Sequence, residues 1–157
     1  MNIMKILISA ALLQFLTFTV TAESLNGQIM VYVPKAEVMN AGDHAEHSLL
    51  LVELKGLATL DDGEVGTIAG AEVAEYNAEQ HTFYGYITIK FNEASTVSFR
   101  FEGEENANSG AYQGTLTYTG GSGRYAGIKG KGKIKGQNYE EINGSHATFT
   151  SSYEIKK

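Results

Sequence analysis

Four ionisable side chains lie close together near residue 45. His44 and His47 form an HxxH pair, and Asp43 and Glu46 lie beside them. Imidazole and carboxylate groups are common zinc ligands. The pair has no third ligand at a convincing spacing, because the other two histidines are far away in the sequence. We therefore predict a polar loop here, with no metal site and no cofactor.

A second set of charges occurs in a glycine-rich segment. Lys129, Lys131, Lys133 and Lys135 alternate with small or apolar residues. A period of two places all four ammonium groups on one face of a strand. That face is either an anion site or a solvated outer surface whose like charges discourage edge-to-edge pairing, and we favour the second interpretation. The glycines would then face inward, where they reduce side-chain volume or let the strand bend.

The sequence offers few other candidates for catalytic residues. Arg100 and Glu102 share a strand face and are either a buried catalytic pair or, as we expect, an exposed ion pair. The chain has no cysteine, so cysteine catalysis and disulfides are excluded. It also has no nucleophile elbow and no Ser-His-Asp order. Catalytic residues therefore stay unassigned.

Aromatic side chains are the best candidates for ligand contacts. Alternation places Tyr112, Tyr118, Tyr153 and Phe99 on the apolar faces of their strands. A buried phenol needs a hydrogen-bond partner. We predict that these four residues contact any ligand in the interior, the alternative being that each hydroxyl bonds a backbone carbonyl or a water.

The elements that position these residues are strands. Period-two alternation dominates after residue 24, and turn residues separate eight segments. The all-β fold expected is an eight-stranded antiparallel up-and-down β-barrel, because closure removes exposed edges. The expected strands span residues 25–33, 46–60, 64–76, 80–92, 95–104, 110–119, 128–137 and 145–156. Eight large residues should be buried inside: Phe83, Ile87, Phe91, Phe99, Phe101, Leu116, Phe149 and Tyr153.

Two segments depart from this pattern. Pro34 to Ala45 is the one long connection, and we predict a solvated loop or an ordered flap there. Segment 46–60 is apolar on both faces, with Leu49, Leu51 and Leu54 among its residues. Either the long connection or a second subunit should cover its outer face.

The N-terminus reads as an export signal. A basic start at Lys5, an apolar run over 6–18 and the small residues before Glu23 match a cleaved leader. We predict a signal peptide over 1–22, one barrel domain over 23–157, and a periplasmic or secreted location with no membrane contact after cleavage. The net charge is 12 − 18 = −6 and becomes −7 without Lys5. Because nucleic acids are also negatively charged, we expect no nucleic acid as partner.

The segment YTGGSGRYAGIKGKGKIKG predicts a strand, a tight corner and a second strand. Gly120, Gly121, Gly123 and Gly127 surround the corner, and at least one should have a positive φ. Ser122 is expected to cap the short helical turn that follows it.

On this segment, together with DDGEVG, FYGYITIKF and STVSFRFEGE, the chain resembles an exported bacterial member of the allene oxide cyclase barrel-like group, calycin-type barrels that include plant dirigent proteins. The resemblance implies an eight-stranded barrel with an apolar lumen, often in dimers or trimers, and cofactor-independent chemistry in the plant cyclases. Those cyclases carry a Glu and an Asn in the first strand. Here LNGQIMVYVP offers Asn26 and Gln28 but no carboxylate.

Three functions remain open. The preferred hypothesis is an exported barrel that binds a small apolar ligand in its lumen. The second is a cofactor-independent cyclase or isomerase of the allene oxide cyclase type. The third is a structural or interaction barrel with a filled lumen. The lumen itself discriminates among them: a cavity with convergent polar groups favours an enzyme, one without them a carrier, and a filled lumen the third.

Overall fold

The computed structural model describes residues 22–77, 81–92 and 94–156. Within these ranges, no helix has the length and apolar character needed to span a lipid bilayer. Residues 1–21 of the predicted leader lie outside them. The described elements are β1 (Glu23–Ser24), β2 (Gly27–Asn40), β3 (Ser48–Leu60), β4 (Val65–Tyr76), β5 (His81–Lys90), β6 (Thr96–Glu105), β7 (Ala111–Ser122), the 3-10 helix η1 (Gly123–Tyr125), β8 (Ile128–Tyr139), the 3-10 helix η2 (Glu140–Ile142) and β9 (Gly144–Ile155).

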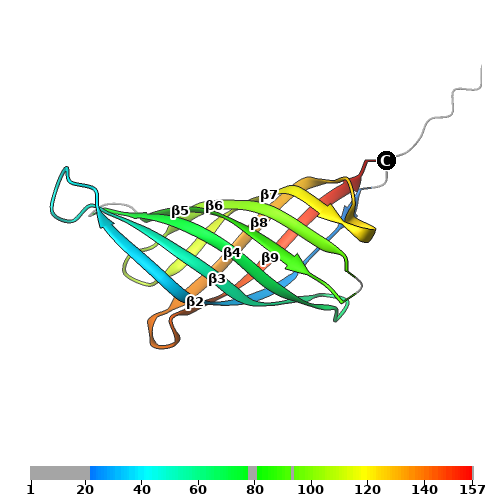
Figure 1. Cartoon of the computed structure of the whole chain (residues 1–157), viewed down its shortest axis with the longest axis horizontal. Helices are drawn as coiled ribbons and strands as arrows, with labels where there is room; N and C mark the ends of the chain where they lie inside the picture. The colour runs from blue at the N-terminus through cyan, green and yellow to red at the C-terminus, as the bar shows by residue number, and fades with distance from the viewer. Residues whose placement is uncertain (1–21, 78–80, 93, 157) are drawn as a thin grey trace, which may run out of the picture.

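The strands form a closed antiparallel barrel, as the alternation predicted. Each of β2 to β8 pairs with the next strand in sequence, and β9 pairs with both β8 and β2. The short strand β1 is additional and pairs with β9 beyond the start of β2, at Glu23 and Tyr153. Figure 1 shows the strands running diagonally around the barrel, with the β2–β3 hairpin extending past the β8–β9 turn.

The predicted inward face is the core. Alternate residues along β5, β6, β7 and β9 are buried, and seven of the eight residues expected inside are at most 9% exposed. Phe83 is only partly buried, although it packs against the core. Side chains on one face of a strand recur every second residue, so one register places the whole set.

The two halves of the lumen differ. Near the chain's C-terminus the lumen is filled by aromatic rings, with centroids 5.7 Å apart for Phe91 and Tyr125 and 6.2 Å for Tyr118 and Tyr153. At the opposite end, where the β2–β3, β6–β7 and β8–β9 connections lie, a cavity of about 410 Å³ remains. One end is therefore packed like a core, and the other is an open pocket.

The predicted connection from Pro34 to Ala45 is wrong over most of its length. Strand β2 continues through Pro34 to Asn40, with a register shift between Tyr32 and Lys35. The pairing of β2 with β9 ends at Tyr32, so Pro34 lies where one side of the strand has no sheet partner. Proline lacks an N–H donor and is tolerated at such an edge or bulge. The connection itself shrinks to residues 41–47.

The glycine corner has the predicted backbone. Gly123 and Gly127 have φ values of +59° and +80°. A Cβ on Gly127 would collide with the backbone carbonyl of Lys156. Glycine is therefore required there both for its backbone conformation and for space.

The predicted cap of that corner is wrong. Ser122 occupies the N-cap position of η1 but makes no capping bond with its side chain. It is the cross-strand partner of Thr96, and their hydroxyl oxygens are 2.8 Å apart. The hydroxyl of Ser95 accepts the bond from the Arg124 N–H instead, at 3.2 Å.

The outer surface has a charged part and an apolar part. The four lysines of β8 are exposed, and Arg100 and Glu102 form a surface ion pair at 2.6 Å. Leu51 and Leu57 on β3 are 50% and 54% exposed. Loop 41–47 therefore leaves the outer face of this strand uncovered.

Candidate functional site in the barrel lumen

The cavity at the open end has apolar walls. Its sides are formed by aliphatic and aromatic side chains from the seven strands β2 to β8, among them Val31, Val52, Ala74, Ile87 and Phe101. Its volume of about 410 Å³ falls within the range of about 300–1,000 Å³ typical of small-molecule sites.

A carboxyl group lies within these walls. Glu72 is on β4, where the inward positions also include Ile68 and Ala74. Its register partner on β5 is Gly85, so no side chain stands beside it from that strand. A Cβ at Gly85 would meet the ring of Phe101 at 2.5 Å. The missing side chain at Gly85 therefore leaves room for the Phe101 ring.

Burial controls the protonation of Glu72. Desolvation, together with the negative charge of Glu105, raises the pKa of the Glu72 carboxyl to about 7. Protein nearly surrounds this side chain, yet the open mouth leaves part of its surface accessible. The carboxyl can therefore exchange protons with solvent and exists in both forms near neutral pH.

Four further polar side chains lie at the mouth of the cavity, at neighbouring positions on strands β4 to β7. Tyr76 pairs with His81, His81 with Glu105, and Glu105 with Tyr112. All four line the cavity. The rings of Tyr76 and His81 meet edge to face at 4.5 Å. The deeper acid, Glu72, thus lies below a ring of polar side chains at the opening.

These polar groups differ in whether they already have a hydrogen-bond partner within the protein. Burial raises the pKa values of Tyr76 and Tyr112 to about 12, so both phenols remain neutral donors at physiological pH. The Tyr112 hydroxyl lies 2.6 Å from the hydroxyl of Ser145. Among the described residues, the buried Nδ1 of His81 has no hydrogen-bond partner. A bound polar group could satisfy that nitrogen.

The structure separates the four residues predicted to contact a ligand. Tyr112 lines the cavity. Tyr118, Tyr153 and Phe99 belong to the packed half, where the Tyr118 hydroxyl lies 2.6 Å from that of Ser151 and the Tyr153 hydroxyl donates to Glu23 at 2.6 Å. A ligand role for all four stays a prediction, and Tyr112 alone among them borders the cavity.

Glu72 was missed in the sequence. The strand GTIAGAEVAEY has small residues on both faces, so its alternation does not show which face is inside. The pairing of β4 with β5 identifies the inward face, because Ile68 and Ile89 are register partners and both are buried. Glu72 lies four residues after Ile68 and therefore on the same face. Glu72 supplies from β4 the lumenal carboxyl that the first strand lacks.

Comparison with known proteins places the fold. No protein-family model matches the sequence, and no curated protein matches it. The barrel is similar to the solved structure of the pterocarpan synthase dirigent protein PsPTS1, with a TM-score of 0.58, 13% identity, and 87% of this chain and 97% of that chain covered. It is also similar to the solved structure of the pterocarpan synthase dirigent protein GePTS1, with a TM-score of 0.57, 14% identity, and 94% of this chain and 100% of that chain covered. The chain therefore has a dirigent-like barrel fold.

Proposed function

We propose that this protein binds a small, mostly apolar molecule in the open half of its lumen. The observation that carries the proposal is the cavity of about 410 Å³, with apolar walls and one ionisable carboxyl among them. Apolar walls supply binding free energy of roughly 25 cal/mol for each Å² removed from water. Glu72, Tyr112 and His81 would orient the polar end of the ligand.

A cavity-filling variant tests this proposal. Ala74 is 3% exposed and lines the cavity, whereas Ala71 on the same strand is exposed. The neutral fluorophore N-phenyl-1-naphthylamine serves as the apolar probe. We expect Ala74→Leu to weaken probe binding at least tenfold, and Ala71→Leu to leave it unchanged. Equal binding by both variants would exclude this cavity as the site.

A second candidate function is cofactor-independent isomerisation or cyclisation. It is favoured by the pKa of about 7 at Glu72, because a general acid or base works best near the operating pH. The ionised carboxylate would take a proton from the carbon next to a ligand carbonyl. The resulting acid would return that proton at another carbon. Tyr112 can donate a hydrogen bond to the developing oxyanion.

Proton exchange tests the second candidate. A small apolar ketone, 2-tetralone, is incubated with the protein in D₂O, and loss of its α-protons is followed by NMR. We expect the protein to accelerate exchange, Glu72→Gln to abolish that acceleration, and Glu141→Gln, at an exposed position, to retain it. Equal acceleration by both variants would remove Glu72 from this role.

Two further proposals concern location and assembly. The leader pattern supports export to a periplasm or the medium, with the mature chain starting at Glu23.

The exposed apolar side chains of the outer face support contact with a second copy of the chain in a dimer or trimer. Leu51, Tyr84 and Tyr86 are 50%, 45% and 54% exposed. Light scattering should show Leu51→Glu reducing the assembly to monomer and Thr115→Glu leaving it unchanged. A parent protein that is already monomeric would refute the contact.

A further inference from the structure

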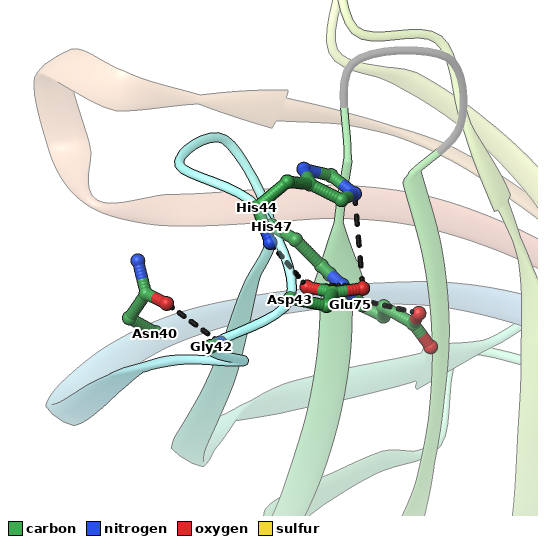
Figure 2. Close-up of polar contacts among 6 residues, drawn as sticks. All are labelled: Asn40, Gly42, Asp43, His44, His47 and Glu75. Atoms are coloured by element: carbon green, nitrogen blue, oxygen red, sulfur yellow. Dashed lines mark hydrogen bonds and ion pairs between the residues drawn. The ribbon is translucent and has the colours of Figure 1, made fainter.

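The connection between β2 and β3 gathers three side chains of metal-binding type. Asp43, His44 and His47 each offer a ligand atom, and these atoms lie within 4.8 Å of one another. None of the three lines the lumen cavity. The cluster lies at the tip of the β2–β3 hairpin, next to the end of β4 (Figure 2). It is therefore a site separate from the lumen.

The loop that carries the cluster has a defined turn. The Ala41 N–H donates to the His47 carbonyl at 2.9 Å and closes the loop. The Gly42 N–H donates to the Asn40 side chain at 2.7 Å, and Gly42 has a φ of +87°. The Asp43 carboxylate also accepts from the His44 N–H at 2.9 Å. The ligand groups are thus brought together by backbone geometry.

His47 is held by carboxylates on both sides. Its Nδ1 lies 2.7 and 2.8 Å from the two Asp43 oxygens, and its Nε2 lies 2.8 Å from Oε1 of Glu75. Glu75 belongs to β4, so it approaches from outside the loop. Metal-binding histidines commonly donate one ring N–H to a carboxylate, which orients the ring and frees the other nitrogen for the metal. Glu75 occupies that position relative to His47.

The second histidine completes the set. His44 Nε2 lies 3.8 Å from Oδ2 of Asp43. Its ring is nearly parallel to that of His47, at 25° and with centroids 5.1 Å apart. Figure 2 shows both rings beside the Asp43 carboxylate. Two imidazoles and one carboxylate are the ligand types of open zinc sites.

We propose that Asp43, His44 and His47 bind one divalent cation of the zinc class, with Glu75 as the residue that positions His47. Two ligands of a tetrahedral zinc ion are roughly 3.3 Å apart, given metal–ligand bonds of about 2.0–2.2 Å. The observed contacts of 2.7 and 3.8 Å would each change by only about half an ångström to reach that separation. The cation would take the place of the Nδ1 proton of His47.

Charge balance supports a divalent ion. Asp43 and Glu75 carry two negative charges, and an imidazole binds a metal ion in its neutral form, so His44 and His47 would add no charge as ligands. A 2+ ion would therefore neutralise the cluster. Asp43 and His44 are half exposed, which leaves the remaining coordination positions to water or to a ligand from solution. The bound ion would also tie loop 41–47 to β4 just before Tyr76, a residue of the cavity mouth.

Zinc titration tests the site. The purified protein is treated with a chelator, dialysed to pH 7.5 and titrated with ZnCl₂ in a calorimeter. We expect one zinc ion per chain, and at least tenfold weaker binding by His44→Gln and His47→Gln. Glu75→Gln should keep the stoichiometry and lose about 10–100-fold in affinity. His146→Gln, a histidine outside the cluster, is the matched control and should bind as the parent does.

Two outcomes would overturn the proposal. One is the lack of stoichiometric zinc binding by the parent, which would make the cluster only a network of ion pairs. The other is unchanged binding by His44→Gln, which would place the ion elsewhere. His44 is half exposed, and in Figure 2 the dashed line from its ring leads to Asp43, so this variant remains informative even where His47→Gln fails to fold. The absorption spectrum of bound Co²⁺ reports the coordination geometry independently.

Discussion

Replacing Glu72 by glutamine should change how the stability of the barrel depends on pH. The substitution keeps the size of the side chain and removes its charge. In the folded protein, burial raises the carboxyl pKa from 4.5 to about 7. A group whose pKa is higher in the folded state stabilises the fold at low pH, and this contribution is lost as the pH rises toward the folded pKa. The parent should therefore lose stability between pH 4.5 and 7.

The size of the effect follows from the shift. One pKa unit corresponds to about 1.36 kcal/mol, so a shift from 4.5 to about 7 corresponds to an upper limit of about 3 kcal/mol. Water in the open mouth screens the ionised carboxylate, and we therefore expect about 1–2 kcal/mol. At pH 8, Glu72→Gln should be more stable than the parent by this amount. At pH 4.5 the two should differ little.

Urea denaturation at pH 4.5, 6, 7 and 8 measures the effect. Glu141→Gln serves as the control, because it removes one negative charge at an exposed position. The quantity of interest is the difference in the free energy of unfolding between each variant and the parent, plotted against pH. A Glu72→Gln variant with the same pH slope as the parent would refute a desolvated lumenal carboxyl.

Three further predictions concern the corner, the tyrosines and the N-terminus. Gly127→Ala should lower the free energy of unfolding by about 1 kcal/mol or more in urea melts. Gly120→Ala should cost far less, because a Cβ added there would meet no atom within 4 Å outside the adjacent residues. Tyr118→Phe should lower the free energy of unfolding of the barrel by about 1 kcal/mol without changing its affinity for 2-naphthol, a hydroxylated probe. Tyr112→Phe should weaken the binding of 2-naphthol in fluorescence titrations. The opposite pattern would move the site to the packed half. Edman sequencing of exported protein should begin at Glu23, and a start at Met1 would contradict the leader.

The barrel was predictable because its main signals are local. Alternation within β5, β6, β7 and β9 assigns each residue to one face, and the buried residues Ile87, Phe99 and Leu116 follow it. Glycines in the corner report a backbone conformation that few other residues adopt, and Gly123 and Gly127 have the positive φ expected. These features depend on neighbours a few residues away. The sequence alone therefore determined the fold class, the faces of these strands and the inward position of Tyr112.

Tertiary structure decided where charged groups meet. Glu72 lies in the lumen because β4 pairs with β5 in one register, and the small residues of β4 leave that register unmarked in the sequence. Glu75 reaches His47 across 28 positions of sequence, and the HxxH spacing gives no indication of this partner. Strand β2 can extend past Pro34 because it pairs only with β3 there, so the proline ring does not interrupt a second ladder of hydrogen bonds. Contacts between strands depend on register and on which edges are paired, and both emerge only when the sheet closes.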